Sequence, residues 1–127
     1  MWVNMLIIPL YDICKADQLL KSLLSDGKNV KVAEFDAENI PAAPYVVYQI
    51  INAQTQQYLD KKSDMDDLYV QIDVYAAKKD VVRRIAKLLR NAIEEDYCYI
   101  ESFTGTERDA ETNLYRIRID TSWFEEN

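Results

Sequence analysis

The residues from Leu68 to Ala76 alternate between apolar and polar side chains. Successive side chains of a strand point to opposite faces of its sheet, so the alternation predicts a strand with one buried and one wetter face. Such a strand is typical of an antiparallel sheet that helices cover on one side. The predicted buried face carries Leu68, Val70, Ile72 and Val74, and the wetter face carries Tyr69, Gln71, Asp73 and Tyr75.

Two helices are predicted from apolar residues that recur every three or four positions. The second and clearer one runs from Lys78 to Glu94, with Asp80 in its first turn, where a negative charge suits the helix dipole. The first runs from Ile13 to Ser25, with Asp12 as its N-cap and Gly27 as its stop. The apolar stretch before it, Trp2 to Leu10, fits either a helical turn or an edge strand.

Further strands are predicted on both sides of this central pair. Val30 to Asp36 alternates and reads as a short strand, and Tyr45 to Ala53 is rich in β-branched and aromatic residues. The second of these is apolar on both faces, which is typical of a strand inside a sheet. A closing hairpin is predicted with arms Tyr97 to Phe103 and Asn113 to Phe124, joined by the polar turn Thr104 to Thr112.

The longest polar segment, Gln54 to Asp67, contains no glycine or proline. It fits a long hairpin that projects from the body, and it fits a disordered loop equally well. Its carboxylates at Asp64, Asp66 and Asp67 could in principle bind a hard cation, but the segment lacks the glycine and the terminal glutamate of a calcium loop. A solvated acidic loop is therefore the favoured interpretation.

Composition narrows the class of protein. The 127 residues are expected to form one domain over 1–127, and the net charge of −7 disfavours binding to nucleic-acid phosphates. No apolar run approaches the roughly 20 residues that span a bilayer, so no membrane association is expected. There is no histidine, and two glycines leave no glycine-rich phosphate loop. The two cysteines are expected to be reduced, buried thiols. No catalytic, cofactor-binding or metal-binding constellation is predicted.

Basic residues give the main candidate for an interaction surface. Arg83, Lys87 and Arg90 are spaced to share one face of the second helix, against the acidic balance of the whole chain. This face could dock an acidic neighbour, including another copy of the chain, although an ordinary solvated helix face is the more common explanation. Arg116 and Arg118 are expected to pair with Asp73 or Glu101 across strands.

The order of four motifs resembles the tail completion or tail terminator proteins of long-tailed bacteriophages and prophages. The motifs are Ala43 to Ile50, Val70 to Ala76, the helix Val82 to Ile93 and the closing strand Tyr115 to Asp120. The resemblance implies an α+β fold: a mixed, mainly antiparallel sheet with two main helices packed on one face. It implies no catalysis, metal or cofactor.

The resemblance also implies a function. Such proteins form a ring, typically of six copies, that ends polymerisation of the tail tube and joins it to the head-side connector. The implied partners are other copies of the chain, the major tail tube protein and the connector protein, with DNA passing through the ring without specific binding. The implied location is the virion, assembled in the cytoplasm of a bacterial host.

Two other functions remain open from the sequence. One is a head-tail connector or another neck subunit, and the other is a small carboxylate-based enzyme or ligand-binding domain. A deep pocket with buried, perturbed carboxylates would favour the enzyme. For either phage function, the candidate contact residues are Arg83, Lys87, Arg90, Tyr58, Asp64, Asp66 and Asp67.

Overall fold

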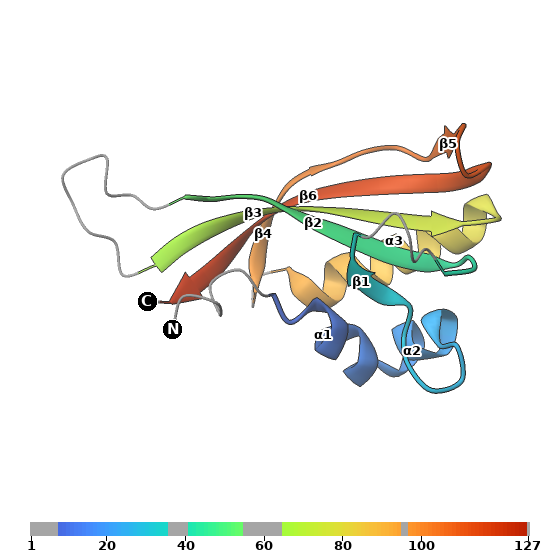
Figure 1. Ribbon diagram of the computed structural model, residues 1–127, viewed down its shortest axis with the longest axis horizontal. Helices are drawn as coiled ribbons and strands as arrows, with labels where there is room; N and C mark the ends of the chain where they lie inside the picture. The colour runs from blue at the N-terminus through green and yellow to red at the C-terminus, as the bar shows by residue number, and fades with distance from the viewer. Residues whose placement is uncertain (1–7, 36–40, 55–64, 95–96, 127) are drawn as a thin grey trace.

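A computed structural model describes residues 8–35, 41–54, 65–94 and 97–126, with side chains described except at 52–54, 65–67 and 124–126. The protein is α+β, as predicted, with helices on one face of a mixed sheet (Figure 1). In chain order the elements are α1 Leu10–Ala16, α2 Gln18–Leu24, β1 Val32–Glu34, β2 Tyr45–Gln54, β3 Met65–Ala76, α3 Lys79–Ile93, β4 Cys98–Phe103, β5 Glu107–Asp109 and β6 Leu114–Glu126.

The sheet has the strand order β1-β2-β3-β6-β4, with β5 also paired to β6. The β1–β2 pair is parallel and the other pairs are antiparallel. The position of β2 inside the sheet confirms the prediction from its two apolar faces. β3 and β6 form the longest ladder, from Met65 opposite Glu126 to Ala76 opposite Tyr115.

The alternation in β3 places a continuous apolar surface against the helices. Its predicted inward residues are all buried, and the outward ones are only partly covered. The register sets Ile72 opposite Ile119 and Val74 opposite Ile117, so β6 extends the same surface. α3 closes the core from the other side with Val82, Ile85, Ala86, Leu89 and Ile93.

The prediction of one helix from Ile13 to Ser25 with Asp12 as its N-cap was wrong, because the structure has two short helices here. α1 begins at Leu10, directly after Pro9, so Asp12 lies in its first turn rather than at its N-cap. The chain becomes extended at Asp17, whose carboxylate accepts hydrogen bonds from the backbone N–H groups of Leu19 and Leu20. These bonds satisfy two donors that a helix start leaves without partners, and so they stabilise a new helix at this position.

Replacing Asp17 with alanine is expected to lower the free energy of unfolding by about 1 kcal/mol, because the N-cap of α2 is lost. Urea unfolding of the intact chain measures this change. Asp17→Asn keeps an oxygen that can accept the same bonds and is expected to retain most of the stability. A loss from Asp12→Ala as large as that from Asp17→Ala would contradict this assignment, because Asp12 accepts no capping bond in α1.

Several predicted boundaries shift. β1 spans Val32–Glu34 and pairs with β2, so it begins two residues later than predicted, and Asp36 at the predicted end lies outside the described residues. The polar turn of the last hairpin contains the unpredicted strand β5, which is held by its pairing with β6. Residues 1–7 and 55–64 lie outside the described residues, so a helical turn or strand near Trp2 and a projecting hairpin stay predictions. The ends of the polar segment do extend β2 and β3, with Gln54 opposite Asp67.

Both cysteines are free and buried, as predicted. Burial raises the pKa of Cys14 to about 12, with a further contribution from Asp17. Burial also raises the pKa of Cys98 to about 12, and Glu94 adds to the effect. A thiol with such a pKa is protonated at neutral pH, and the thiolate is the nucleophilic form. The two cysteines therefore belong to the core packing.

Candidate interaction surfaces

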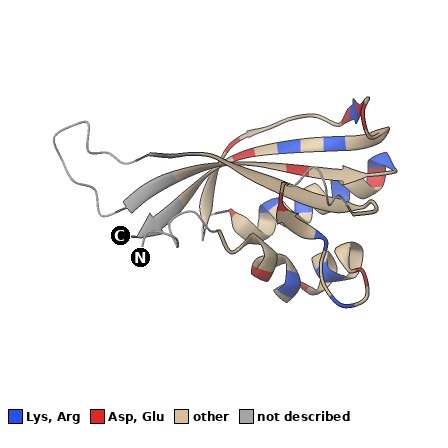
Figure 2. Ribbon diagram, in the orientation of Figure 1, with Lys and Arg blue, Asp and Glu red and all other residues tan. Residues whose placement is uncertain are grey.

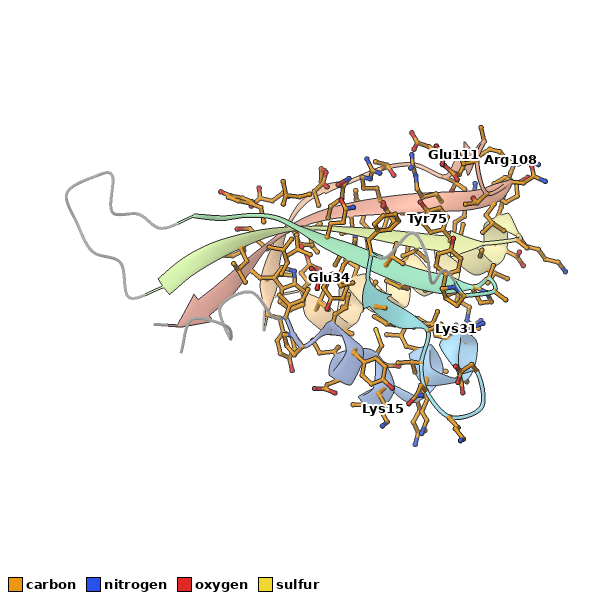
Figure 3. All side chains as sticks on the ribbon, in the orientation of Figure 1. Lys15, Lys31, Glu34, Tyr75, Arg108 and Glu111 are labelled. Carbon is orange, nitrogen blue, oxygen red and sulfur yellow. The ribbon has the colours of Figure 1, made fainter. Side chains whose placement is uncertain are left out.

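The face of the sheet opposite the helices carries a polar hollow of about 420 Å³. It lies over β2, β3 and β6 and is bordered by the turn after β5, which holds Glu111 (Figure 3). Its aromatic wall contains Tyr45 and Tyr75, whose rings stack with centroids 5.0 Å apart. Burial raises the pKa of both tyrosines, so their hydroxyl groups are protonated at neutral pH.

Cross-strand ion pairs line the hollow. The Arg118 Nε lies 2.9 Å from the Asp73 Oδ1, which confirms one of the predicted pairs. Arg116 does not pair as predicted. Its guanidinium donates to the Glu107 Oε1 at 2.9 Å and lies 3.9 Å from the Asp109 Oδ1, so its partners come from the unpredicted strand β5. The hydrogen bond to Glu107 raises the pKa of Arg116 above its ordinary value.

Hydrogen bonds hold the Asp109 carboxylate in its charged form. The Thr112 hydroxyl and backbone N–H donate to its Oδ2 at 2.6 and 3.0 Å. The Thr112 hydroxyl is the largest cause of a lowered Asp109 pKa, and Arg116 contributes in the same direction. A general acid requires the opposite shift, toward a raised pKa. The shift of Asp109 is therefore opposite to the one expected of a general acid.

The lowered pKa of Asp109 predicts a change in acid stability. Because the folded pKa lies below the ordinary 3.8, its stabilising contribution is complete above that pH and is lost as the pH falls through the folded value. Thr112→Val removes the hydroxyl hydrogen bond, so it is expected to reduce this loss of stability at acid pH. The free energy of unfolding at successive pH values measures the loss. Thr106→Val is the matched control, because the Thr106 hydroxyl bonds to Arg83. An equal loss of stability at acid pH in the wild type, Thr112→Val and Thr106→Val would contradict the role of Thr112.

The predicted basic stripe, Arg83, Lys87 and Arg90, lies on α3, where Figure 2 shows Lys and Arg positions. The structure confirms that the three share one side of the helix, and all three are exposed. Arg83 donates from its Nε to the Thr106 Oγ1 at 2.9 Å, and Arg90 lies 6.0 Å from the centroid of the Phe103 ring. The stripe is therefore continuous with the end of β4 and the segment that follows it.

Aromatic side chains extend this surface along the edge of the sheet. β4 is the last strand in the sheet order, and Tyr97 and Phe103 on or beside it are 38% and 40% exposed. Tyr99, opposite Ser122 in the β4–β6 ladder, points to the other face of the sheet. Exposed aromatic and arginine side chains are enriched at the centres of protein interfaces. The spacing along one helix predicts the basic stripe but not these aromatic neighbours, because they follow α3 in the chain and Phe103 reaches Arg90 only in the fold.

The other predicted contact residues lie at a different place in the molecule. Tyr58 and Asp64 are outside the described residues. Asp66 and Asp67 lie at the start of β3, where the register sets Asp66 opposite Glu125 and Asp67 opposite Phe124. This end of β3 and the end of β6 project beyond the helices (Figure 1). Asp66 and Asp67 thus lie on a different element of the fold from the basic stripe on α3.

Comparison with known proteins assigns the family. In fold, the chain is similar to a chain from the structure "Virion of native gene transfer agent (GTA) particle", with a TM-score of 0.65, 15% identity, and coverage of 93% of this chain and 92% of that chain. No curated protein matches it. The family model "Tail completion protein gp17" matches residues 8–126. The chain therefore belongs to the tail completion protein gp17 family.

The family membership confirms the resemblance predicted from the motifs and identifies the chain as a structural protein of a phage tail. In the described part of the chain, no helix has the length and apolar character needed to cross a membrane.

Proposed function

We propose that the chain acts as one domain that caps the tail tube as a ring of six copies. The ring ends tube polymerisation and provides the joint to the head-side connector. It is assembled in the cytoplasm of a bacterial host and remains in the virion, and it needs no catalytic step. The observation that carries this proposal is the family match over residues 8–126, which spans every described helix and strand.

The distribution of charge supports a ring. A closed ring needs two different, complementary surfaces on each copy, because the head of one subunit meets the tail of the next. This chain has a basic, partly aromatic surface beside β4 and acidic residues at the ends of β3 and β6. The paired charges in the hollow of the open sheet face suit a surface for protein contact better than one for carboxylate chemistry.

Binding to isolated tail tubes tests the proposal. Purified tubes of the same virion, free of connector protein, are incubated with the gold-labelled chain and viewed by electron microscopy. The label is expected at one end of each tube, and tubes with bound chain are expected to stop elongating when more tube protein is added. Labelling along the whole tube, or continued elongation of labelled ends, would contradict a cap. Binding to the connector but not to the tube would identify a neck subunit instead.

A further inference from the structure

We infer that the basic stripe of one copy docks in the polar hollow of the next copy in the ring. The stripe is Arg83, Lys87 and Arg90 on α3, and the hollow lies on the open face of the sheet. The inference rests on the proposed function, since it names the contact between copies in the proposed ring.

The charges that line the hollow favour a cationic partner. Its lining holds three carboxylates and two guanidinium groups, those of Asp73, Asp109, Glu111, Arg116 and Arg118. Asp73 and Asp109 lie close to the arginines, whereas Glu111 forms no salt bridge among the described residues. The exposed Glu111 carboxylate therefore leaves an excess of negative charge at the border of the hollow (Figure 3).

Aromatic side chains beside these charges suit long cationic side chains. Phe35 follows β1, and its backbone N–H donates to the Tyr48 backbone oxygen at 2.8 Å, which holds it beside β2. Its side chain lines the hollow and is 45% exposed. An ammonium or guanidinium group is attracted to the face of an aromatic ring, while its alkyl stem covers apolar surface. The hollow of about 420 Å³ is within the range of typical binding pockets, so it has room for such side chains.

The basic stripe has the chemistry that the hollow favours. Its three side chains are exposed on one helix face, where like charges repel. Thr106 holds the Arg83 guanidinium, and Arg90 lies over the Phe103 ring, so less conformational freedom is lost on binding. The pair that Arg90 forms with Glu94, at 3.9 Å, is about half exposed and therefore weak. A surface with excess negative charge would relieve the repulsion along the stripe.

The sheet separates the two surfaces within one chain. The hollow lies over β2, β3 and β6 on the open face, whereas α3 packs against the other face (Figure 1). The bond from Arg83 to Thr106, in the segment after β4, places the stripe beside the β4 edge of the sheet. The stripe of a chain therefore cannot enter the hollow of the same chain, and the contact requires a second copy. Because the two surfaces differ, the contact is head-to-tail and can close into a ring.

Cross-linking of the full chain tests which residues touch. A zero-length carbodiimide joins amines to carboxylates in contact, and low ionic strength leaves exposed charges least screened. Mixing isotope-labelled with unlabelled chains distinguishes links between copies from links within a copy. The wild-type chain is expected to give multimers in which Lys87 of one copy is joined to Glu111 of another, identified by mass spectrometry of the linked peptides.

Two matched variants reverse one charge on each surface. Lys87→Glu changes the stripe and Glu111→Lys changes the hollow, both at exposed positions. Sedimentation velocity measures assembly without a covalent link, and circular dichroism checks that each variant is folded. Each variant alone is expected to form multimers at least about tenfold less than the wild type, because charges of the same sign then face each other. Lys21→Glu makes the same change of charge at an exposed position of α2 and is expected to sediment like the wild type.

An equimolar mixture of the two variants is the decisive sample. In an alternating ring, the Lys87→Glu stripe meets the Glu111→Lys hollow, and an unchanged stripe meets an unchanged hollow. Every contact then joins charges of opposite sign, so the mixture is expected to recover the wild-type multimers.

The outcomes separate the contact from the function. A wild-type chain that sediments only as a monomer, links from Lys87 to carboxylates outside the hollow, or a mixture that fails to recover would each overturn the inferred contact. A monomeric wild-type chain whose binding to tube ends is abolished by Glu111→Lys would assign the hollow to the tube protein instead. Recovery in the mixture together with absent tube binding by the wild type would retain the contact and overturn the proposed cap.

Discussion

Replacing Trp123 with alanine is expected to lower the free energy of unfolding by about 4 kcal/mol. The side chain is only 2% exposed and is part of the core between the sheet and the helices. Its ring lies 6.1 Å from that of Tyr97, and its Nε1 donates to the Thr121 Oγ1 at 2.7 Å. The substitution removes the largest fully buried side chain of the described core and leaves a cavity that its neighbours can fill only in part.

Equilibrium unfolding in guanidinium chloride measures this loss. Leu19→Ala is the matched control, because Leu19 is 51% exposed on α2 and alanine is an equally good helix former. The control is expected to change the free energy of unfolding by less than about 0.5 kcal/mol. A loss for Trp123→Ala that is as small as the control would contradict the placement of the indole in the core.

Replacing Thr121 with valine is expected to lower the free energy of unfolding by about 2 kcal/mol, although the two side chains have the same shape. The Thr121 hydroxyl is buried, donates to the backbone oxygen of Val70 at 2.9 Å and accepts the hydrogen bond from Trp123. Valine leaves both groups buried without this partner. A buried polar group that loses its hydrogen bond destabilises the fold by the full cost of its desolvation.

A double-mutant cycle separates this effect from packing. Trp123→Phe removes the indole N–H but keeps an aromatic ring, so the donor that Thr121→Val would leave without a partner is absent in the double variant. The combined loss is therefore expected to be smaller than the sum of the two single losses by at least about 0.5 kcal/mol, as for residues in direct contact. Strict additivity would show that the indole and the hydroxyl do not interact.

The regular elements could be predicted because their burial follows from local periodicity. α3 repeats its apolar residues at helical spacing and was predicted to within one residue at each end. The alternation in β3 predicted Leu68 to Ala76, but not residues 65–67 at its start, where two aspartates interrupt the pattern. β5 could not be predicted in this way. It has three residues, and its existence depends on pairing with β6 and on the contacts of Arg116 with Glu107 and Asp109.

The break between α1 and α2 shows the limit of the helical pattern. Asp17 falls on the polar side of a continuous apolar repeat, so it reads as an ordinary solvated residue of one long helix. The signal that could have identified it is its residue type directly before Gln18–Leu24, since aspartate is among the preferred N-caps. Asp12 competes for the same assignment, and only the backbone conformation distinguishes the two.

The interaction surfaces were predictable only where all their residues lie on one helix or strand. The basic stripe lies on one helix, so its spacing alone places Arg83, Lys87 and Arg90 together. The hollow draws Tyr45, Asp73, Asp109 and Arg116 from four different strands, and no local pattern in the sequence unites them. The facing positions of Asp66 and Glu125 likewise require the register between β3 and β6.

Deletion of the gene for this chain from its phage or prophage gives the most direct measurement of the proposed cap. Tail tubes from induced cells are measured for length by negative-stain electron microscopy, with and without the chain supplied from a plasmid. A cap that ends polymerisation predicts tubes longer than the wild-type length in the deletion, together with free heads, and wild-type length after complementation. Tubes of normal length in the deletion, joined to heads or not, would contradict a role in ending the tube.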